Sequence, residues 1–152
     1  MADDQPLITK ESLLRDFESK DRHRIWSATW EVIKTRNIDT LTFLAGKIDQ
    51  IKDGTSTIEL GGAIEKNRDS LNFAVQKLRF FKSGSGCLCE LYPKNSHFSP
   101  EEEQRAGNVV VLNKKEVPYA SEFKCQCTVC KKEYTVQEGE YHFAFWNWRS
   151  CY

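Results

Sequence analysis

The stretch KCQCTVCKKEY, residues 124–134, places three cysteines within six residues of a chain that has six in all. Cys127 and Cys130 are two residues apart, a spacing that lets a tight turn direct both thiolates at one metal ion. A second pair, Cys87 and Cys89, lies in CLCELY, for which we predict a strand, and alternate residues of a strand point to one side. Together the two pairs predict a tetrahedral zinc site: Cys87, Cys89, Cys127 and Cys130.

Other uses of these cysteines stay open. Cys125 or His142 would replace Cys87 or Cys89 as a ligand if one of those points elsewhere. Cysteine is also often buried as a compact apolar side chain without any partner. A redox pair fits less well, because a strand pattern, KKEYTV, follows the two-residue spacing where a helix would be expected. We expect Cys151, near the end of the chain, to take no part.

Composition places the chain among globular proteins. Of its 152 residues 39% are hydrophobic and 29% charged, and Lys+Arg equals Asp+Glu at 22 each, so no strong field favours nucleic acid or anionic lipid. No apolar run approaches the roughly 18 residues of a membrane span, so we expect no membrane partner. The acidic start, MADDQPLITKESLL, lacks the regions of a signal peptide and indicates a cytoplasmic protein. A reducing compartment favours metal binding or burial over disulfides.

The first half of the chain has helical periodicity. We predict helices over 10–19, from Asp21 through 36, over 37–54 and over 63–81, the last ending at the flexible SGSG of 83–86. In the 37–54 helix, Asn37 is the expected cap and Gly54 the expected stop. The pattern predicts a helical bundle, with HEAT-like hairpins as one arrangement of it.

The second half changes to strand patterns. CLCELY, NVVVLN, EYTVQ and YHFAFWNW are short, aromatic or β-branched, and bounded by polar segments. The connection 95–107 is either a solvated loop or holds a short helix beginning at Ser99 and Pro100. The sequence therefore predicts an α+β fold: one domain over 1–152, with a helical layer at 1–82 and a small antiparallel β layer at 87–152.

The terminal segment EGEYHFAFWNWRSCY is unusually aromatic. Strand alternation places Tyr141 and Phe145 on one side and Trp146 and Trp148 on the other, so both faces carry large rings. One face is expected to be core, and the other must meet the helices, a metal site or a partner. We expect both faces to be covered within the chain, which is how layered folds are built.

Groups that could do chemistry are scarce. His23, His97 and His142 lie far apart in different segments, and nothing pairs them with a nucleophile. GGAIEKN lacks the further glycines and the Lys-Ser/Thr of a phosphate loop. An enzyme using the cysteine cluster would need a low-pKa thiol. The sequence thus favours a binding protein without catalytic activity.

The helical first half, the GCLCELY segment and the terminal CTVCKKEYTVQEGEYHFAFWNW block resemble cytosolic immunity proteins of bacterial contact-dependent growth inhibition and related polymorphic toxin systems. The resemblance is strongest over 87–92 and 127–148. It implies a non-enzymatic protein that binds a cognate toxin domain, often a nuclease, and neutralises it stoichiometrically. Carboxylates can imitate phosphates to a basic nuclease cleft, although such runs are also common on hydrated surfaces. The candidate toxin contacts are Glu101, Glu102, Glu103, Glu138, Glu140 and Tyr141.

A second hypothesis is a zinc-stabilised nucleic-acid-binding module. Lys124, Lys131 and Lys132 would contact phosphates beside the cysteine turn, and the aromatic strand would stack bases. The balanced net charge argues against it.

Overall fold

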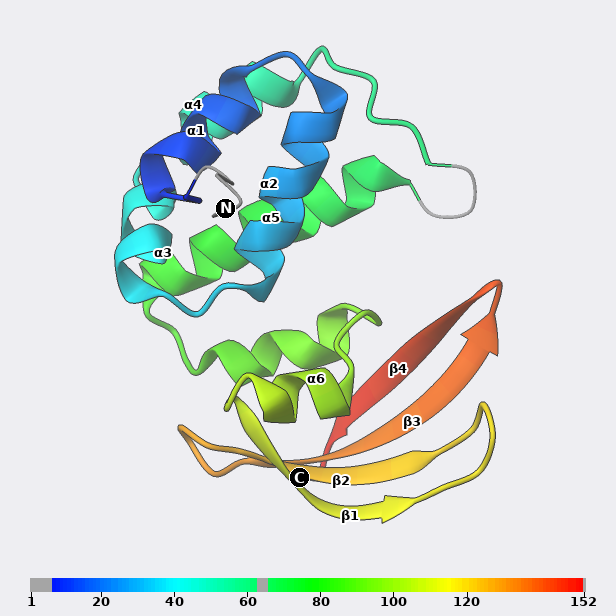
Figure 1. Cartoon of the computed structure of the whole chain (residues 1–152). Helices are drawn as coiled ribbons and strands as arrows, with labels where there is room; N and C mark the ends of the chain where they lie inside the picture. Colours follow the sequence, from blue (N-terminus) through cyan, green and yellow to red (C-terminus); the bar gives the residue numbers. More distant parts are fainter. Residues whose placement is uncertain (1–6, 63–65, 152) are drawn as a thin grey trace, which may run out of the picture. The chain divides into compact units, whose positions relative to one another are not determined.

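The computed structural model describes residues 7–62 and 66–151, which form an α+β protein (Figure 1). The predicted fold class is confirmed: a helical N-terminal region is followed by a four-stranded antiparallel sheet. The chain divides into two compact units, residues 1–85 and 86–152, called here the helical unit and the sheet unit. The single domain over 1–152 stays a prediction.

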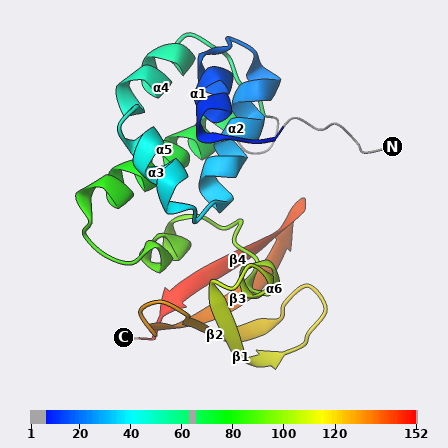
Figure 2. The ribbon, with the colours of Figure 1, turned by 60° about the vertical axis from the view of Figure 1, so that its left-hand side comes forward.

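The described residues of the helical unit form five helices, whose arrangement is shown in Figure 2. They are α1 (Lys10–Glu18), α2 (Arg22–Lys34), α3 (Ile38–Ala45), α4 (Ile48–Thr55) and α5 (Asn67–Ser83). Asp21 begins α2 as predicted, because its carboxylate accepts hydrogen bonds from the backbone N–H groups of His23 and Arg24. No helix among the described residues is long and apolar enough to cross a membrane. The HEAT-like arrangement stays a prediction.

The prediction of one helix over 37–54 is wrong. The chain turns at Gly46, whose N–H bonds back to the carbonyls of Thr42 and Phe43 and ends α3. Helices α3 and α4 both bury apolar residues, and the helical spacing of these residues continues across the break. Gly54 lies inside α4 rather than after it, and a Cβ there would lie 2.9 Å from the carbonyl oxygen of Phe17. The glycine thus permits close approach to α1.

The predicted 63–81 helix corresponds to α5, which begins at Asn67 and runs to Ser83. Ile64, counted in the predicted apolar stripe, lies outside the described residues. Gly84 ends α5 in the left-handed conformation that glycine adopts without steric cost.

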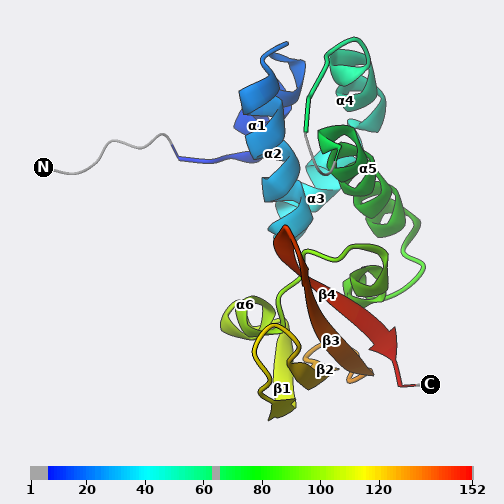
Figure 3. The ribbon, with the colours of Figure 1, turned by 90° about the vertical axis from the view of Figure 1, so that its right-hand side faces the viewer.

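The sheet unit has a meander of four antiparallel strands in the order β1-β2-β3-β4 (Figure 3). The elements are a 3-10 helix η1 (Leu88–Lys94), then α6 (Pro100–Arg105), β1 (Val109–Lys115), β2 (Glu122–Cys127), β3 (Glu133–Tyr141) and β4 (Phe143–Ser150). Helix α6 packs beside β1. It is the short helix foreseen in the 95–107 connection, capped by Ser99 and with Pro100 in its first turn.

One strand prediction is wrong, and one strand was not predicted. CLCELY forms η1 instead of a strand: the N–H of Glu90 bonds to the carbonyl of Cys87 at 3.0 Å and closes a turn, and Pro93 has no N–H to give to a ladder. Conversely, EFKCQC forms β2, for which no strand was predicted from the sequence. Its alternation of buried Phe123, Cys125 and Cys127 is that of a half-buried strand.

The core of the sheet unit lies on one face of the sheet, where the ring of Tyr92 stacks on Trp148 with centroids 4.2 Å apart. Trp146 packs against the same cluster, and Trp148 donates its indole N–H to the carbonyl of Phe98. On the other face the ring of Phe145 covers Gly139, where a Cβ would lie 2.3 Å from that ring. The large rings of Trp146, Trp148 and Phe145 are thus covered, in whole or in part, within the sheet unit. The expectation that both faces are covered is wrong for Tyr141, whose ring is 69% exposed.

A buried lysine joins two helices of the helical unit. Lys77 in α5 is only 3% exposed, and its ammonium group donates hydrogen bonds to the carbonyls of Ile33 (2.8 Å) and Thr35 (2.6 Å) at the end of α2. The C-terminal carbonyls of a helix lack partners within the helix and carry its partial negative charge. Lys77 therefore caps α2 from a neighbouring helix.

We predict that Lys77→Met lowers the free energy of unfolding of the helical unit by about 1–3 kcal/mol, because it leaves buried carbonyls without their donor. Urea denaturation followed by the helical circular dichroism signal measures this loss. Lys82→Met, which removes the same charge from an exposed position in the last turn of α5, is the control. Equal stability of the two variants would contradict the capping role.

Candidate metal centre

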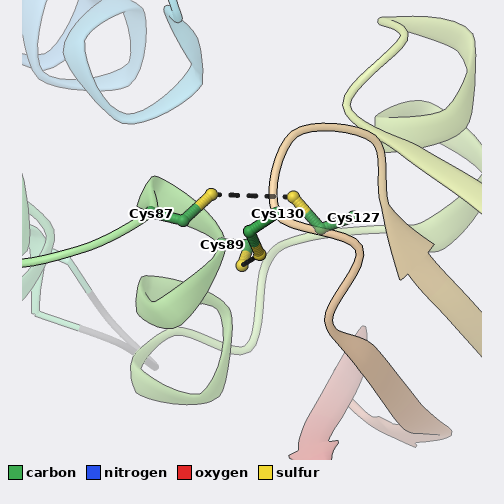
Figure 4. A group of neighbouring side chains, drawn as sticks. All are labelled: Cys87, Cys89, Cys127 and Cys130. Atoms are coloured by element: carbon green, nitrogen blue, oxygen red, sulfur yellow. Dashed lines mark hydrogen bonds between the residues drawn. The ribbon is translucent and has the colours of Figure 1, made fainter.

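Four cysteine sulfurs converge in the sheet unit (Figure 4). Cys87 and Cys89 come from the start of η1, and Cys127 and Cys130 come from the end of β2 and the turn toward β3. All four Sγ atoms lie within 4.8 Å of one another, with 3.6 Å between those of Cys87 and Cys127 and 3.4 Å between those of Cys89 and Cys130. Tetrahedral bonds of about 2.3 Å place sulfurs about 3.8 Å apart. These four cysteines could therefore hold a metal ion.

The turn between β2 and β3 directs Cys127 and Cys130 inward. The N–H of Lys131 bonds to the carbonyl of Cys127, and the N–H of Cys127 bonds to the carbonyl of Lys132. Lys131 has φ +68°, a left-handed conformation that lets the chain reverse sharply. The backbone N–H of Val129 points at Cys127 Sγ, 3.4 Å away. The turn thus presents two sulfurs together with a backbone donor that stabilises thiolate charge.

The other pair, Cys87 and Cys89, is brought to the cluster by a turn and not by the predicted strand. Cys87 has extended backbone angles and caps η1, and the first turn of η1 brings Cys89 back to the same side. Strand alternation, on which the pairing of Cys87 with Cys89 was based, plays no part. The tight turn nevertheless achieves the same convergence of sulfurs.

The thiols differ in acidity. Burial raises the pKa of Cys127, but hydrogen bonds involving the backbone of Cys130 and Val129, and contacts with the thiols of Cys87 and Cys89, lower it to about 7. Burial raises the pKa values of Cys87 and Cys89. A metal ligand must be a thiolate, so an ion has to displace protons from the thiols with raised pKa values. Metal affinity is therefore expected to fall as the pH is lowered.

Polar side chains around the cluster hold its members in place. The hydroxyl of Tyr134 donates a hydrogen bond to Cys89 Sγ at 3.2 Å, and burial together with this contact raises the pKa of the tyrosine. The ammonium group of Lys132 lies 5.8 Å from the centroid of the Tyr134 ring and 4.0 Å from the carboxylate of Glu90. A donor to a ligand atom fixes its orientation, and a nearby cation offsets thiolate charge.

The alternative ligands lie outside the cluster. Cys125 is fully buried in the apolar core on the same face of β2 as Cys127, and burial raises its pKa to about 12. His142 lies between β3 and β4, at the end of β3 farthest from the cysteine turn, roughly 26 Å along the strand. Cys151 is exposed beyond β4. None of the three belongs to the group of converging sulfurs found among the described residues.

The acidic candidates on α6 separate into exposed and buried groups. Glu101 and Glu102 are exposed, and Glu101 forms an ion pair of 2.6 Å with Lys114. Glu103 is only 9% exposed, and its carboxylate accepts hydrogen bonds from the Tyr92 hydroxyl (2.6 Å) and the Asn108 amide (2.8 Å). The expectation of an exposed carboxylate is therefore wrong for Glu103, which links α6 to the core.

The remaining candidates lie toward the far end of the β3–β4 hairpin. Glu138 is half-buried, Glu140 is exposed, and Tyr141 is 69% exposed at the last position of β3. Tyr141 pairs across the turn with Phe143. This hairpin end thus offers a large ring and a carboxylate to solvent.

The chain matches no protein-family model, no curated protein and no solved structure. The resemblance to immunity proteins therefore rests on the quoted motifs. The cysteine cluster rests on geometry alone.

We predict that purified chain carries bound metal in nearly equimolar amount, and that Cys130→Ser greatly lowers this amount because a tetrahedral site loses one of its four ligands. Metal content is measured by mass spectrometry on protein prepared without chelator. Cys151→Ser changes the other exposed cysteine and serves as the control. Full metal content in Cys130→Ser, or its loss in Cys151→Ser, would contradict the assignment.

A second prediction concerns the Tyr134 hydroxyl. Tyr134→Phe keeps the ring in the core and removes the donor to Cys89, so we expect metal affinity to fall about tenfold. Competition with a chromophoric chelator measures the change. Tyr92→Phe, which removes a hydroxyl bonded to Glu103 instead of a sulfur, should leave the affinity within about twofold. An unchanged affinity in Tyr134→Phe would show that the hydroxyl does not orient the ligand.

Proposed function

We propose that the protein is a cytoplasmic immunity protein, which binds a cognate toxin domain stoichiometrically and has its sheet unit stabilised by zinc. The single observation that carries the proposal is the end of the β3–β4 hairpin, where Tyr141 is 69% exposed beside the exposed carboxylate of Glu140. Tyrosine is a favoured interface anchor, because it buries a large area with few torsions to freeze. An exposed aromatic of this kind supports a binding role.

Zinc is the ion that fits the donors. Thiolate is a soft ligand, and four cysteines in roughly tetrahedral arrangement are typical of structural zinc sites. Four protein ligands leave no open position for a water or a substrate, in contrast to catalytic zinc. This chemistry supports a structural role for the sulfurs and a protein without catalytic activity.

Zinc would supply stability that the sheet unit needs. Units of fewer than about 80 residues rarely gain enough from one apolar core and often use a metal. Here the ion would join η1 to the β2–β3 turn and so hold the strands that carry Tyr141. A rigid hairpin loses less entropy on binding, which increases affinity.

The exposed carboxylates give the surface a preference among partners. Glu102 and Glu140 are exposed and could attract a basic toxin, as a nuclease domain would be, whereas Glu101 is exposed but would first have to exchange its 2.6 Å ion pair with Lys114. Such charges chiefly raise the association rate, whereas a buried aromatic anchor slows dissociation. Together they support tight, stoichiometric inhibition.

The contacts of the lysines beside the cysteine turn argue against the nucleic-acid-binding alternative. The ammonium group of Lys124 lies 3.9 Å from the carboxylate of Glu133, and that of Lys132 lies 4.0 Å from Glu90. Lys131 donates to the carbonyl of Thr128 at 3.0 Å. These contacts within the unit compete with phosphate for the same cations. Salt-sensitive retention on single-stranded DNA would favour the alternative.

The proposal is tested by finding the toxin and titrating it. A pull-down from the native cell, read together with the gene immediately upstream, identifies the toxin domain. We expect its activity to be lost completely at an equimolar amount of this protein. Residual activity at excess, or turnover of the toxin by catalytic amounts, would overturn the proposal.

The hairpin residue is tested separately. Tyr141→Ala should weaken toxin binding about 30-fold, the effect of removing an interface anchor worth about 2 kcal/mol. Tyr119→Ala, which removes a ring that is 70% exposed on the β1–β2 connection, is the matched control and should bind within about twofold of wild type. Calorimetry measures both affinities. Equal affinity of the two variants would exclude Tyr141 as an anchor.

A further inference from the structure

A cleft of about 320 Å³ lies between α4 and α5 in the helical unit. Every ionisable residue of the described chain that lines it is a cation: Lys52 from α4, and Arg68 and Arg79 from α5. The exposed amides of Asn72 and Gln76 lie between the two arginines along α5. The nearly buried side chains of Leu71 and Val75 also contribute to the lining. The cleft thus combines apolar surface with positive charge.

The positive lining continues toward the end of α5. Arg79 also lines a neighbouring hollow of about 420 Å³, together with Lys82 and one carboxylate, Asp49. From Arg68 to Lys82 the helix rises about 21 Å. The two hollows lie along the same helix, share Arg79 and are here together called the α5 groove, a largely cationic surface in a protein whose formal net charge is zero.

The cations of the α5 groove have different roles. Arg68 donates a hydrogen bond of 2.9 Å to the carbonyl of Thr55 and another to the carbonyl of Ile58, and so holds the chain that follows α4. Lys52 and Arg79 are exposed on opposite walls of the cleft. The fold thus uses Arg68, whereas the charges of Lys52 and Arg79 face solvent and can meet a ligand.

We propose that the α5 groove binds an acidic, amphipathic segment of a partner protein. Its carboxylates would pair with Lys52, Arg79 and Lys82, and its apolar side chains would cover Leu71 and Val75. A guanidinium group binds a carboxylate through two parallel hydrogen bonds, which makes Arg79 the most selective of these contacts. Helix-in-groove recognition uses this combination of apolar anchors and flanking charge.

A nucleic acid fits the groove less well. No aromatic residue is present among the described residues that line the two hollows, whereas single-stranded nucleic acid is held largely by stacking on rings. Apolar lining offers nothing to phosphates or sugars, but it favours leucine-like side chains. The shape and lining together therefore select a peptide.

The inference goes beyond the proposed function, because the candidate toxin contacts all lie on the sheet unit and the α5 groove lies on the helical unit. It holds whether or not the hairpin binds a toxin. Its test uses no toxin, so a failure of one proposal is distinguished from a failure of the other.

The test measures binding of a labelled peptide to the full chain by fluorescence anisotropy. The peptide has about 16 residues, enough for a helix of about 24 Å, with leucine at every third or fourth position and glutamate between. The groove variant is Lys52→Gln with Arg79→Gln, two exposed positions. The control variant, Arg15→Gln with Arg22→Gln, removes the same charge from exposed positions of α1 and α2. Circular dichroism checks that both variants fold.

We expect wild type to bind the peptide, the groove variant to bind at least about tenfold more weakly, and the control variant to stay within about twofold. The same peptide with glutamine for glutamate should bind at least about tenfold more weakly to wild type. The proposal would be overturned if the groove variant bound the peptide as tightly as wild type does. It would also be overturned if wild type bound a single-stranded oligonucleotide of similar length more tightly than the peptide and the groove variant lost that binding.

Discussion

The convergence of four sulfurs is the constraint on which the sheet unit depends. It brings η1, which packs against β4, beside the turn between β2 and β3. Through η1 it positions Tyr92, whose ring stacks on Trp148 of β4 and whose hydroxyl holds the buried carboxylate of Glu103. Contacts thus run from the four cysteines through Tyr92 to the aromatic core and to α6.

The acidities of the thiols determine what a metal ion would have to do at this cluster. Burial raises the pKa values of Cys87 and Cys89, so near neutral pH these thiols are protonated and neutral, and a metal ion would have to displace their protons. Zinc, the ion proposed above, binds thiolate strongly, and its free energy of binding would then become free energy of folding. Cys127, with a pKa of about 7, is the natural first ligand because it loses its proton most easily.

The sequence contained most of the site and less of its geometry. Two short cysteine spacings identified all four converging residues, although the strand alternation assumed for Cys87 and Cys89 is not what brings those two together. The one local signal against a strand at CLCELY was Pro93, which directly follows it, whereas the contacts that hold the turn come from a hairpin some 40 residues away. The break at Gly46 was equally hard to predict, because the buried residues of α3 and α4 keep the spacing expected of one continuous helix. Glu103 shows that a run of identical charges can divide between solvent and core.

Zero net charge conceals two surfaces of opposite character. The sheet unit presents Glu101, Glu102 and Glu140 with the ring of Tyr141, whereas the helical unit presents Lys52, Arg79 and Lys82 around apolar side chains. Exposed charges act over about one Debye length, roughly 8 Å in physiological salt. Each surface would therefore act on a partner through its local field, which cancellation over the whole chain does not weaken. A basic partner for the one surface and an acidic partner for the other, as proposed above, are thus both compatible with a net charge of zero.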